Sequence, residues 1–243
     1  MERILNHERM HYLFGDQFNV SVAESALAGL ERLPEIRQQL IEDTANGKIH
    51  TGIRLVSYLD VDTGLFMSVL QTFPGRPSII SFYADSKHRF FGGQTLVCVP
   101  FQFCLEEYKP EGDHIVYRHT FKAPSFEPDF LKKERARLSD AEFLKAVVFV
   151  KSRDAYVTVP GMSYVGLTQR SWQERYVEHT EKALEKDGSS LFHQAIRDMQ
   201  GQPVIHVHDV SLFGATREQA KEYERTLIRE STLAPKGLNM KVG

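Results

Sequence analysis

The chain has 243 residues, 42% of them hydrophobic, and a formal net charge of −2, a composition typical of a globular protein with enough apolar side chains for one or two cores. It contains no run of about 18 apolar residues and no apolar segment at its start, so we expect neither a membrane-spanning nor a secreted protein. Cys98 and Cys104 lie in one strand-like apolar run, too far apart to bridge each other, which indicates reduced thiols and a cytoplasmic protein.

The small net charge conceals a difference between the two halves of the chain. Residues 1–130 carry 12 Lys and Arg against 17 Asp and Glu, whereas residues 131–243 carry 18 against 15. A mildly basic second half favours nucleic-acid contact by that half alone. The ordinary alternative is that both halves simply have solvated surfaces.

Helical and then strand-like patterns fill the first half. Residues 1–20 show no clear period and are expected to form a loop or a short strand. Between residues 21 and 46, apolar residues at helical spacing predict two short helices interrupted at Pro34. Five β-rich runs separated by turn sequences then predict an antiparallel sheet with the helices on one face: 53–59, 65–70, 78–83, 95–103 and 114–121.

A change of pattern near residue 125 predicts a domain boundary. Prolines and the charged run 132–137 indicate a linker at residues 126–143, because such a segment is too polar for a core. The predicted fold class is therefore α+β with two domains, 1–125 and 144–243. The first would hold the antiparallel sheet with its helices, and the second a small central sheet flanked by helices.

The second domain is expected to alternate strands and helices. Two capping boxes, Ser171 with Glu174 and Thr216 with Gln219, mark helix starts. The predicted elements are a buried strand at 146–150, a hairpin over 156–166 with its turn at Pro160-Gly161, and a tight turn at Gly166. They continue with helices at 171–187 and 190–200, a strand at 203–211, and a helix from 216 to about 232.

Four side chains in this half suggest phosphodiester chemistry. Arg175 and His179 lie four residues apart and so share one helical face, just after the strand that carries Tyr164. Glu224 falls within the apolar face of the last helix, where a carboxylate is costly unless it is paired or binds a cation. Each residue alone is more often structural.

His206 and His208 form a weaker candidate. Alternate residues of a strand share a face, so the two imidazoles could chelate a metal, but the sequence shows no third ligand.

In order and spacing, residues 144–241 resemble a GIY-YIG nuclease domain. Tyr164-Val165-Gly166 is similar to the second tripeptide of that family. Arg175 resembles the catalytic arginine and His179 the histidine one turn later. Residues 190–200 resemble the second helix, Glu224 the metal-binding glutamate, and Gly237-Leu238-Asn239 the closing asparagine motif.

The first tripeptide of the family departs from this agreement. No Gly-Ile-Tyr precedes Tyr164. Val147-Val148-Phe149 matches best in strand character but supplies a phenyl ring in place of a phenol. Tyr156 is the alternative source of a hydroxyl, from the inserted hairpin.

The resemblance implies a role for each residue. A single Mg²⁺ or Mn²⁺ on Glu224 would stabilise the scissile phosphate and the leaving oxygen. Arg175 would bind the non-bridging oxygens, Tyr164 would orient or deprotonate water, and His179 would assist it. Phe149 or Tyr156 would complete the catalytic group. Substrate contacts are expected from Gly166, Arg170, His193 and Asn239.

The function implied is a divalent-metal-dependent endonuclease, with DNA the favoured polymer and RNA the alternative. The first domain would recognise the substrate or a partner, with no membrane contact, and a homo-oligomer is compatible with the sequence. Two other functions are consistent with these residues. One is a GIY-YIG-like nucleic-acid-binding protein that has lost cleavage, and the other is a nuclease effector regulated by an N-terminal sensor.

Overall fold

The computed structural model describes residues 4–31, 52–60, 63–72, 76–85, 94–124, 156–185, 190–202 and 204–242. The expected linker at 126–143 and the expected strand at 146–150, with Phe149, lie outside the described residues.

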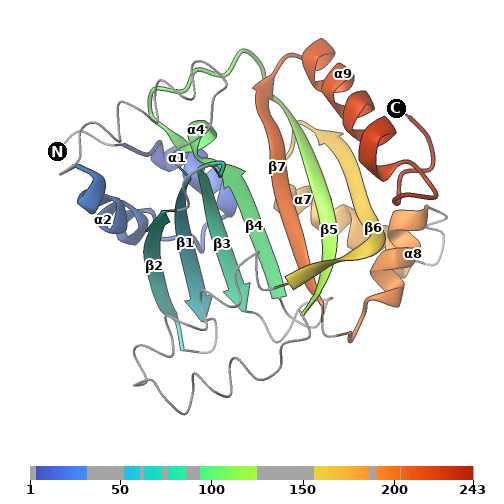
Figure 1. The fold of residues 1–243 in the computed structure, drawn as a ribbon, viewed down its shortest axis with the longest axis horizontal. Helices are drawn as coiled ribbons and strands as arrows, with labels where there is room; N and C mark the ends of the chain where they lie inside the picture. The colour runs from blue at the N-terminus through green and yellow to red at the C-terminus, as the bar shows by residue number, and fades with distance from the viewer. Residues whose placement is uncertain are drawn as a thin grey trace. The chain divides into compact units, whose positions relative to one another are not determined.

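Seven strands form one mixed sheet in the order β2-β1-β3-β4-β7-β5-β6 (Figure 1). The prediction of two separate sheets, one in each domain, is therefore wrong. Local sequence patterns identify extended segments but not their partners, because pairing is decided by contacts between residues distant in the chain. The strands are β1 (Ile53–Asp60), β2 (Leu65–Thr72), β3 (Ile79–Asp85), β4 (Gln94–Pro100), β5 (His114–Pro124), β6 (Tyr156–Thr168) and β7 (Ile205–Ala215).

The chain divides into two compact units that interleave along the sequence. The first comprises Met1–Asp85, Cys98–Tyr108 and Ser125–Ala155, and the second comprises Ser86–Val97, Lys109–Pro124 and Tyr156–Gly243. Strand β5 thus belongs to the second unit, together with β6 and β7.

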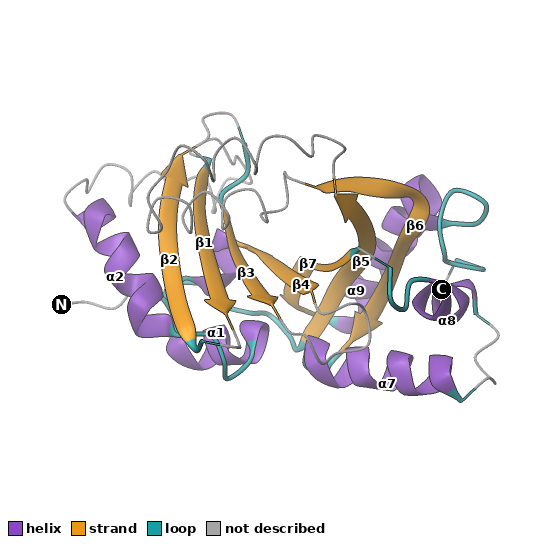
Figure 2. Ribbon diagram, turned by 90° about the horizontal axis from the view of Figure 1, so that it is seen from below, coloured by secondary structure: helices purple, strands orange, loops and turns teal. Residues whose placement is uncertain are grey.

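In the first unit, β1 pairs with β2 in antiparallel and with β3 in parallel orientation, so the expected all-antiparallel arrangement is also wrong. Helix α2 (Val20–Glu31) packs against β2 and β1 (Figure 2). Helix α1 (His7–Phe14) lies where a loop or short strand was expected, and its cap Asn6 accepts a hydrogen bond from the Arg9 amide.

The run expected as a strand at 95–103 ends early. After β4 the chain turns into a short helix, α4 (Phe101–Cys104). Cys98 and Cys104 are both buried thiols that are not bridged to each other.

In the second unit, β5 lies between β6 and β7 and is antiparallel to both. Tyr117 pairs with Gly166, and His119 pairs with Tyr164 on one side and His208 on the other. Successive strand residues point to opposite faces, so these side chains share one face of the sheet.

Strand β6 replaces the predicted hairpin. It runs as one strand of 13 residues, with an irregularity in register opposite Thr120–Lys122. Gly166 lies within this strand and not in a tight turn, so that prediction is wrong as well.

Helices cover both faces of this part of the sheet. Helices α7 (Trp172–Leu184) and α8 (Leu191–Asp198) contribute to one core around Phe121 and Phe192. Helix α9 (Arg217–Leu227) and the π-helical turn η2 (Ile228–Thr232) pack with Val116 and Val165 on the opposite face. Both predicted capping boxes are confirmed. Among the described helices, none is long and apolar enough to cross a membrane.

Candidate functional site

Two tyrosines from neighbouring strands form the centre of the candidate site. Tyr117 of β5 is fully buried, and its ring centroid lies 6.5 Å from that of Tyr164 on β6. A β-carbon on Gly166 would lie 2.5 Å from the hydroxyl oxygen of Tyr117, closer than any real contact. Glycine at position 166 therefore allows the Tyr117 ring to lie across β6 toward Tyr164.

Helix α7 brings Arg175 and His179 to these phenols. The Ser171 capping box sets where the helix begins, and a spacing of four residues stacks the two side chains. The Nε2 atom of His179 lies 3.2 Å from the Tyr117 hydroxyl and 3.4 Å from Nη2 of Arg175. The Arg175 guanidinium also acts on the Tyr117 phenol, where it opposes the dominant effect of burial on the pKa. The structure thus assembles Tyr117, Tyr164, Arg175 and His179.

Arg175 also has the ordinary partner of a helical arginine. Its Nη1 pairs with the carboxylate of Glu178, which Arg170 pairs with as well. The Arg170 side chain is 59% exposed. The guanidinium of Arg175 therefore faces the Glu178 carboxylate with Nη1 and the His179 imidazole with Nη2.

Glu224 lies on α9 and is half-buried. Its carboxylate makes no hydrogen bond or salt bridge within the described ranges. Burial raises the pKa of Glu224, against the opposing effect of Arg225 and Lys221. Its negative charge is the smallest of the contributions to the pKa values of Tyr117 and Tyr164, and α9 packs on the opposite face of the sheet from α7.

These residues have a clear protonation state. Burial, more than any neighbouring charge, raises the pKa of Tyr117 and Tyr164, so both are neutral phenols at neutral pH. Burial, with the charge of Arg175 next in importance, lowers the pKa of His179 to about 3, so its imidazole is neutral. A neutral imidazole that contacts a phenol can accept the phenol's proton.

The other described residues expected in the site lie on α8, near the C-terminus and at the start of β6. His193 on α8 lies beside His179, with its Nε2 3.2 Å from Nδ1 of His179. Asn239 is buried, and its amide makes two hydrogen bonds to the backbone of Val165, at 2.9 and 2.8 Å. Tyr156 begins β6, opposite Pro124. Phe149 lies outside the described residues.

Tyr117 was missed by sequence reasoning. The run Ile115-Val116-Tyr117 was correctly predicted as a strand, but it precedes the expected linker and was assigned to the other domain. The signal available was an apolar pair followed by tyrosine in a strand, similar to Gly-Ile-Tyr. Only the pairing of β5 with β6 identifies it as the neighbour of Tyr164.

A cluster of buried histidines adjoins this site. His119, His206 and His208 are almost fully buried, and Nδ1 of His119 lies 2.5 Å from Nε2 of His206. Burial lowers the pKa of all three, that of His208 to about 3. Within the described ranges, no group of three or more His, Cys, Asp or Glu side chains is arranged to hold a metal. His206 and His208 are therefore not part of such a group.

Comparison with protein-family models, with curated protein sequences and with solved structures finds no match for this chain.

Proposed function

We propose that this protein is a divalent-metal-dependent phosphodiesterase that cleaves nucleic acid with a GIY-YIG-like site in its second unit. The observation that supports this most strongly is the arrangement of Tyr117 and Tyr164 on paired strands, with Arg175 and His179 against them. Glu224 acts electrostatically on both phenols. Phosphodiester hydrolysis requires an activated water, positive charge at the phosphate oxygens and help for the leaving oxygen, and these groups, with a cation on Glu224, can supply them.

In this proposal Ile115-Val116-Tyr117 takes the place of the first tripeptide, and Tyr117 supplies the phenol that was sought at Phe149 or Tyr156. Two observations support it. Tyr117 is the register partner of Gly166 in Tyr164-Val165-Gly166, and its hydroxyl contacts His179. A tyrosine missing from the first tripeptide favours a protein that has lost cleavage, and in this proposal Tyr117 supplies that tyrosine.

The carboxylate of Glu224 fits a hard divalent cation. It is half-buried and has no ion-pair partner within the described ranges, a costly arrangement unless a positive charge accompanies it. Mg²⁺ typically uses one or two protein carboxylates, with water and substrate phosphate completing its shell. When bound, such a cation supplies Lewis-acid stabilisation of the phosphate.

The protein's own groups have complementary roles. Arg175 has donors beyond those facing Glu178 and His179, and it can offer them to the non-bridging phosphate oxygens, where negative charge accumulates. Tyr117, hydrogen-bonded to the neutral His179, can pass its proton to the imidazole and then take one from an attacking water. Tyr164 can orient that water.

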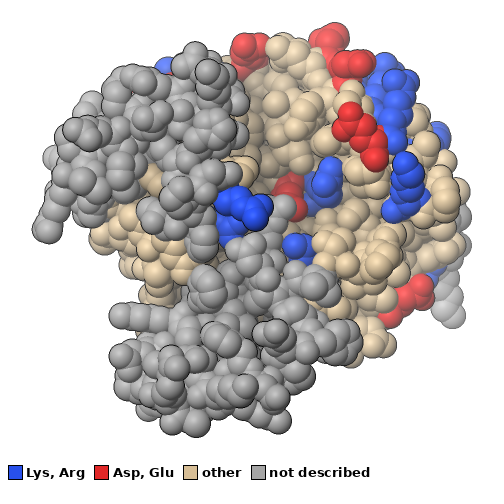
Figure 3. Space-filling model, in the orientation of Figure 1, with Lys and Arg blue, Asp and Glu red and all other residues tan. Residues whose placement is uncertain are grey.

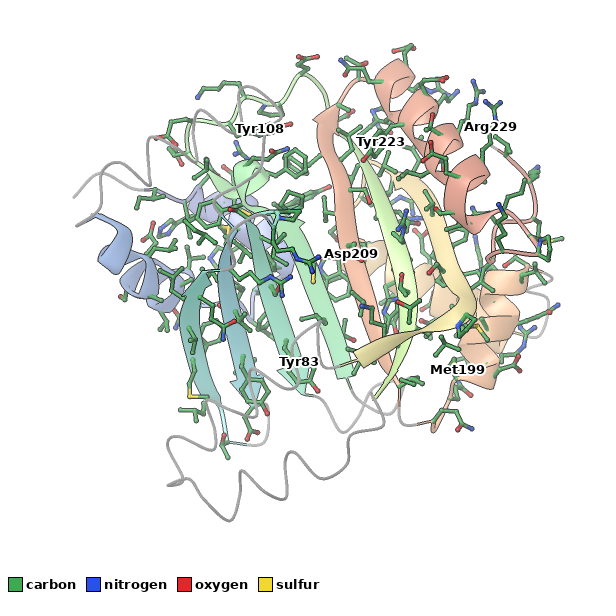
Figure 4. All side chains as sticks on the ribbon, in the orientation of Figure 1. Tyr83, Tyr108, Met199, Asp209, Tyr223 and Arg229 are labelled. Carbon is green, nitrogen blue, oxygen red and sulfur yellow. The ribbon has the colours of Figure 1, made fainter. Side chains whose placement is uncertain are left out.

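The surface around Glu224 suits a polyanion with bases. Tyr223 on α9, next to Glu224 in the sequence, is 39% exposed, and Arg229 on the following turn η2 is exposed as well (Figure 4). Base stacking on an exposed aromatic ring and phosphate contact by arginine are common in nucleic-acid binding. Basic and acidic residues are interspersed on the face that includes α9 (Figure 3), which favours local phosphate contacts over a broad basic patch.

A substrate panel tests the proposal. We expect the purified wild type to cleave at least one of double-stranded DNA, single-stranded DNA and RNA in Mg²⁺ or Mn²⁺, with DNA preferred. Tyr117→Phe and Glu224→Gln should each lower the rate by about 100-fold or more, whereas Glu222→Gln, on the exposed side of the same helix, should not. Phe149→Tyr should bring no gain, because Tyr117 already supplies the phenol. Binding without cleavage under every metal tested would refute the catalytic proposal.

A further inference from the structure

A continuous line of hydrogen-bonding side chains leads from Tyr117 away from the sheet. The Tyr117 hydroxyl lies 3.2 Å from Nε2 of His179, and Nδ1 of His179 lies 3.2 Å from Nε2 of His193. The three residues come from β5, α7 and α8. Ser190 caps α8 by accepting a hydrogen bond from the His193 amide at 3.1 Å, which fixes where α8 begins and so where His193 lies on it.

The donors around His179 define its tautomer. Arg175 can only donate, and its Nη2 lies 3.4 Å from Nε2 of His179. The unprotonated nitrogen of the neutral ring is therefore Nε2, whose single lone pair is shared by the donors Arg175 and Tyr117. The proton of His179 then resides on Nδ1, from which it is donated to Nε2 of His193. All hydrogen bonds in the line run in one direction, from the phenol to His193.

We propose that His193 is the terminal proton acceptor of the site, reached from Tyr117 through His179; this rests on the nuclease function proposed above. The O–H bond of Tyr117 breaks and an N–H bond forms at Nε2 of His179. The Nδ1–H bond of His179 breaks and an N–H bond forms at Nε2 of His193. The products are a phenolate, a neutral His179 in the other tautomer and a His193 imidazolium, and no electrons are exchanged.

The imidazole of His193 is neutral at rest, and its surroundings lower its basicity. Burial lowers its pKa first, followed by the charges of Lys182, Arg197 and Arg175, so the resting imidazole is neutral. These groups, with His179, are the titratable side chains that act on it from α7 and α8. The imidazolium forms only when a negative charge appears at Tyr117, and a bound phosphate adds further compensation.

A merely orienting role for His193 makes a different prediction. Glutamine places an amide oxygen near the position of Nε2, so it can accept from Nδ1–H of His179 and hold the tautomer, but it cannot take up a proton. Phenylalanine can do neither. His193→Gln and His193→Phe therefore separate proton transfer from positioning.

The experiment combines single-turnover cleavage with ¹⁵N NMR of the histidine side chains in the full-length protein without substrate. We expect His179 to be the Nδ1–H tautomer in the wild type and in His193→Gln. His193→Gln and His193→Phe should both cleave about 100-fold more slowly than the wild type. Gln194→Ala, an exposed change on the same helix, should cleave normally.

Wild-type cleavage by His193→Gln would overturn the relay and leave only an orienting role. A proton on Nε2 of His179 in the wild type would overturn it as well. A wild type that cleaves no substrate would instead refute the nuclease function, whatever the tautomer.

Discussion

Tyr117 and Gly166 face each other across β5 and β6 so closely that position 166 accepts no side chain. A β-carbon there would lie 2.5 Å from the Tyr117 hydroxyl oxygen and 2.7 Å from Cζ of the same ring. The need for glycine in Tyr164-Val165-Gly166 is thus explained by Tyr117 on the neighbouring strand β5. It allows the phenol to reach His179.

This relationship predicts a coupled effect on stability. Gly166→Ala should displace the Tyr117 ring and destabilise the protein by about 1–3 kcal/mol, the usual cost of overpacking a core. Tyr117→Phe removes the closest atom, so Gly166→Ala should cost less in that background. A double-mutant cycle by denaturant unfolding measures the coupling. Strictly additive effects would show that the two positions do not meet.

Glu224→Gln should separate cation binding from stability. Its raised pKa means that the folded protein disfavours the charged carboxylate, so the neutral variant should be at least as stable as the wild type at pH 7 without metal. Mn²⁺ binding by calorimetry should be lost. The matched control Glu222→Gln should bind Mn²⁺ like the wild type. Retention of Mn²⁺ binding by Glu224→Gln would remove Glu224 from the metal site.

Arg175→Lys should reduce cleavage although it keeps the charge. The planar guanidinium of Arg175 contacts Glu178 and His179 at the same time, and the smaller ammonium group of lysine cannot contact both. We expect kcat to fall by about 100-fold with a smaller change in KM, because the lost donors act on charge that develops in the transition state. Steady-state kinetics on the best substrate would measure this. An unchanged kcat would argue that Arg175 is only a surface ion-pair partner.

Asn239→Ala should act through stability and not through substrate affinity. The amide of Asn239 bonds both the N–H and the C=O of Val165, and its loss leaves these backbone groups unpaired in a buried place. A loss of about 2–4 kcal/mol is expected. Thermal unfolding checks it, and KM measured below the melting temperature should stay close to that of the wild type. A stable variant with raised KM would restore the substrate contact expected for this residue.

The buried histidines predict sensitivity to acid. His119, His206 and His208 are held neutral in the folded state, where His119 also faces His179 and Arg175, whereas in the unfolded chain they take up protons below about pH 6.5. The unfolded state then binds more protons, so the free energy of unfolding decreases as the pH is lowered. The decrease is up to about 1.4 kcal/mol per pH unit for each histidine.

Denaturant unfolding between pH 7.5 and 5 measures that slope. His208 is the best position for a control, because neither of its ring nitrogens has a hydrogen-bond partner within the described ranges. His208→Phe keeps an aromatic ring beside Tyr117 and should reduce the slope by about one histidine's share. An identical slope in the variant would locate the acid sensitivity elsewhere.

Local pattern in the sequence determined where α7 and α9 begin and located the strand segments of β1, β2, β3 and β5. The capping boxes at Ser171 and Thr216 are formed as predicted, since a cap depends only on residues three apart. The same holds for the shared face of Arg175 and His179, which follows from helical periodicity alone.

The tertiary structure alone decided which strands are neighbours and, with that, which tyrosine stands beside Tyr164. Tyr117 precedes it by a long stretch of chain, and no local rule links residues so far apart. Pairing of β5 between β6 and β7 follows from burial of a common face, which depends on the whole chain. For the same reason, the contact of His193 with His179 and that of Asn239 with Val165 appear only once the chain is folded.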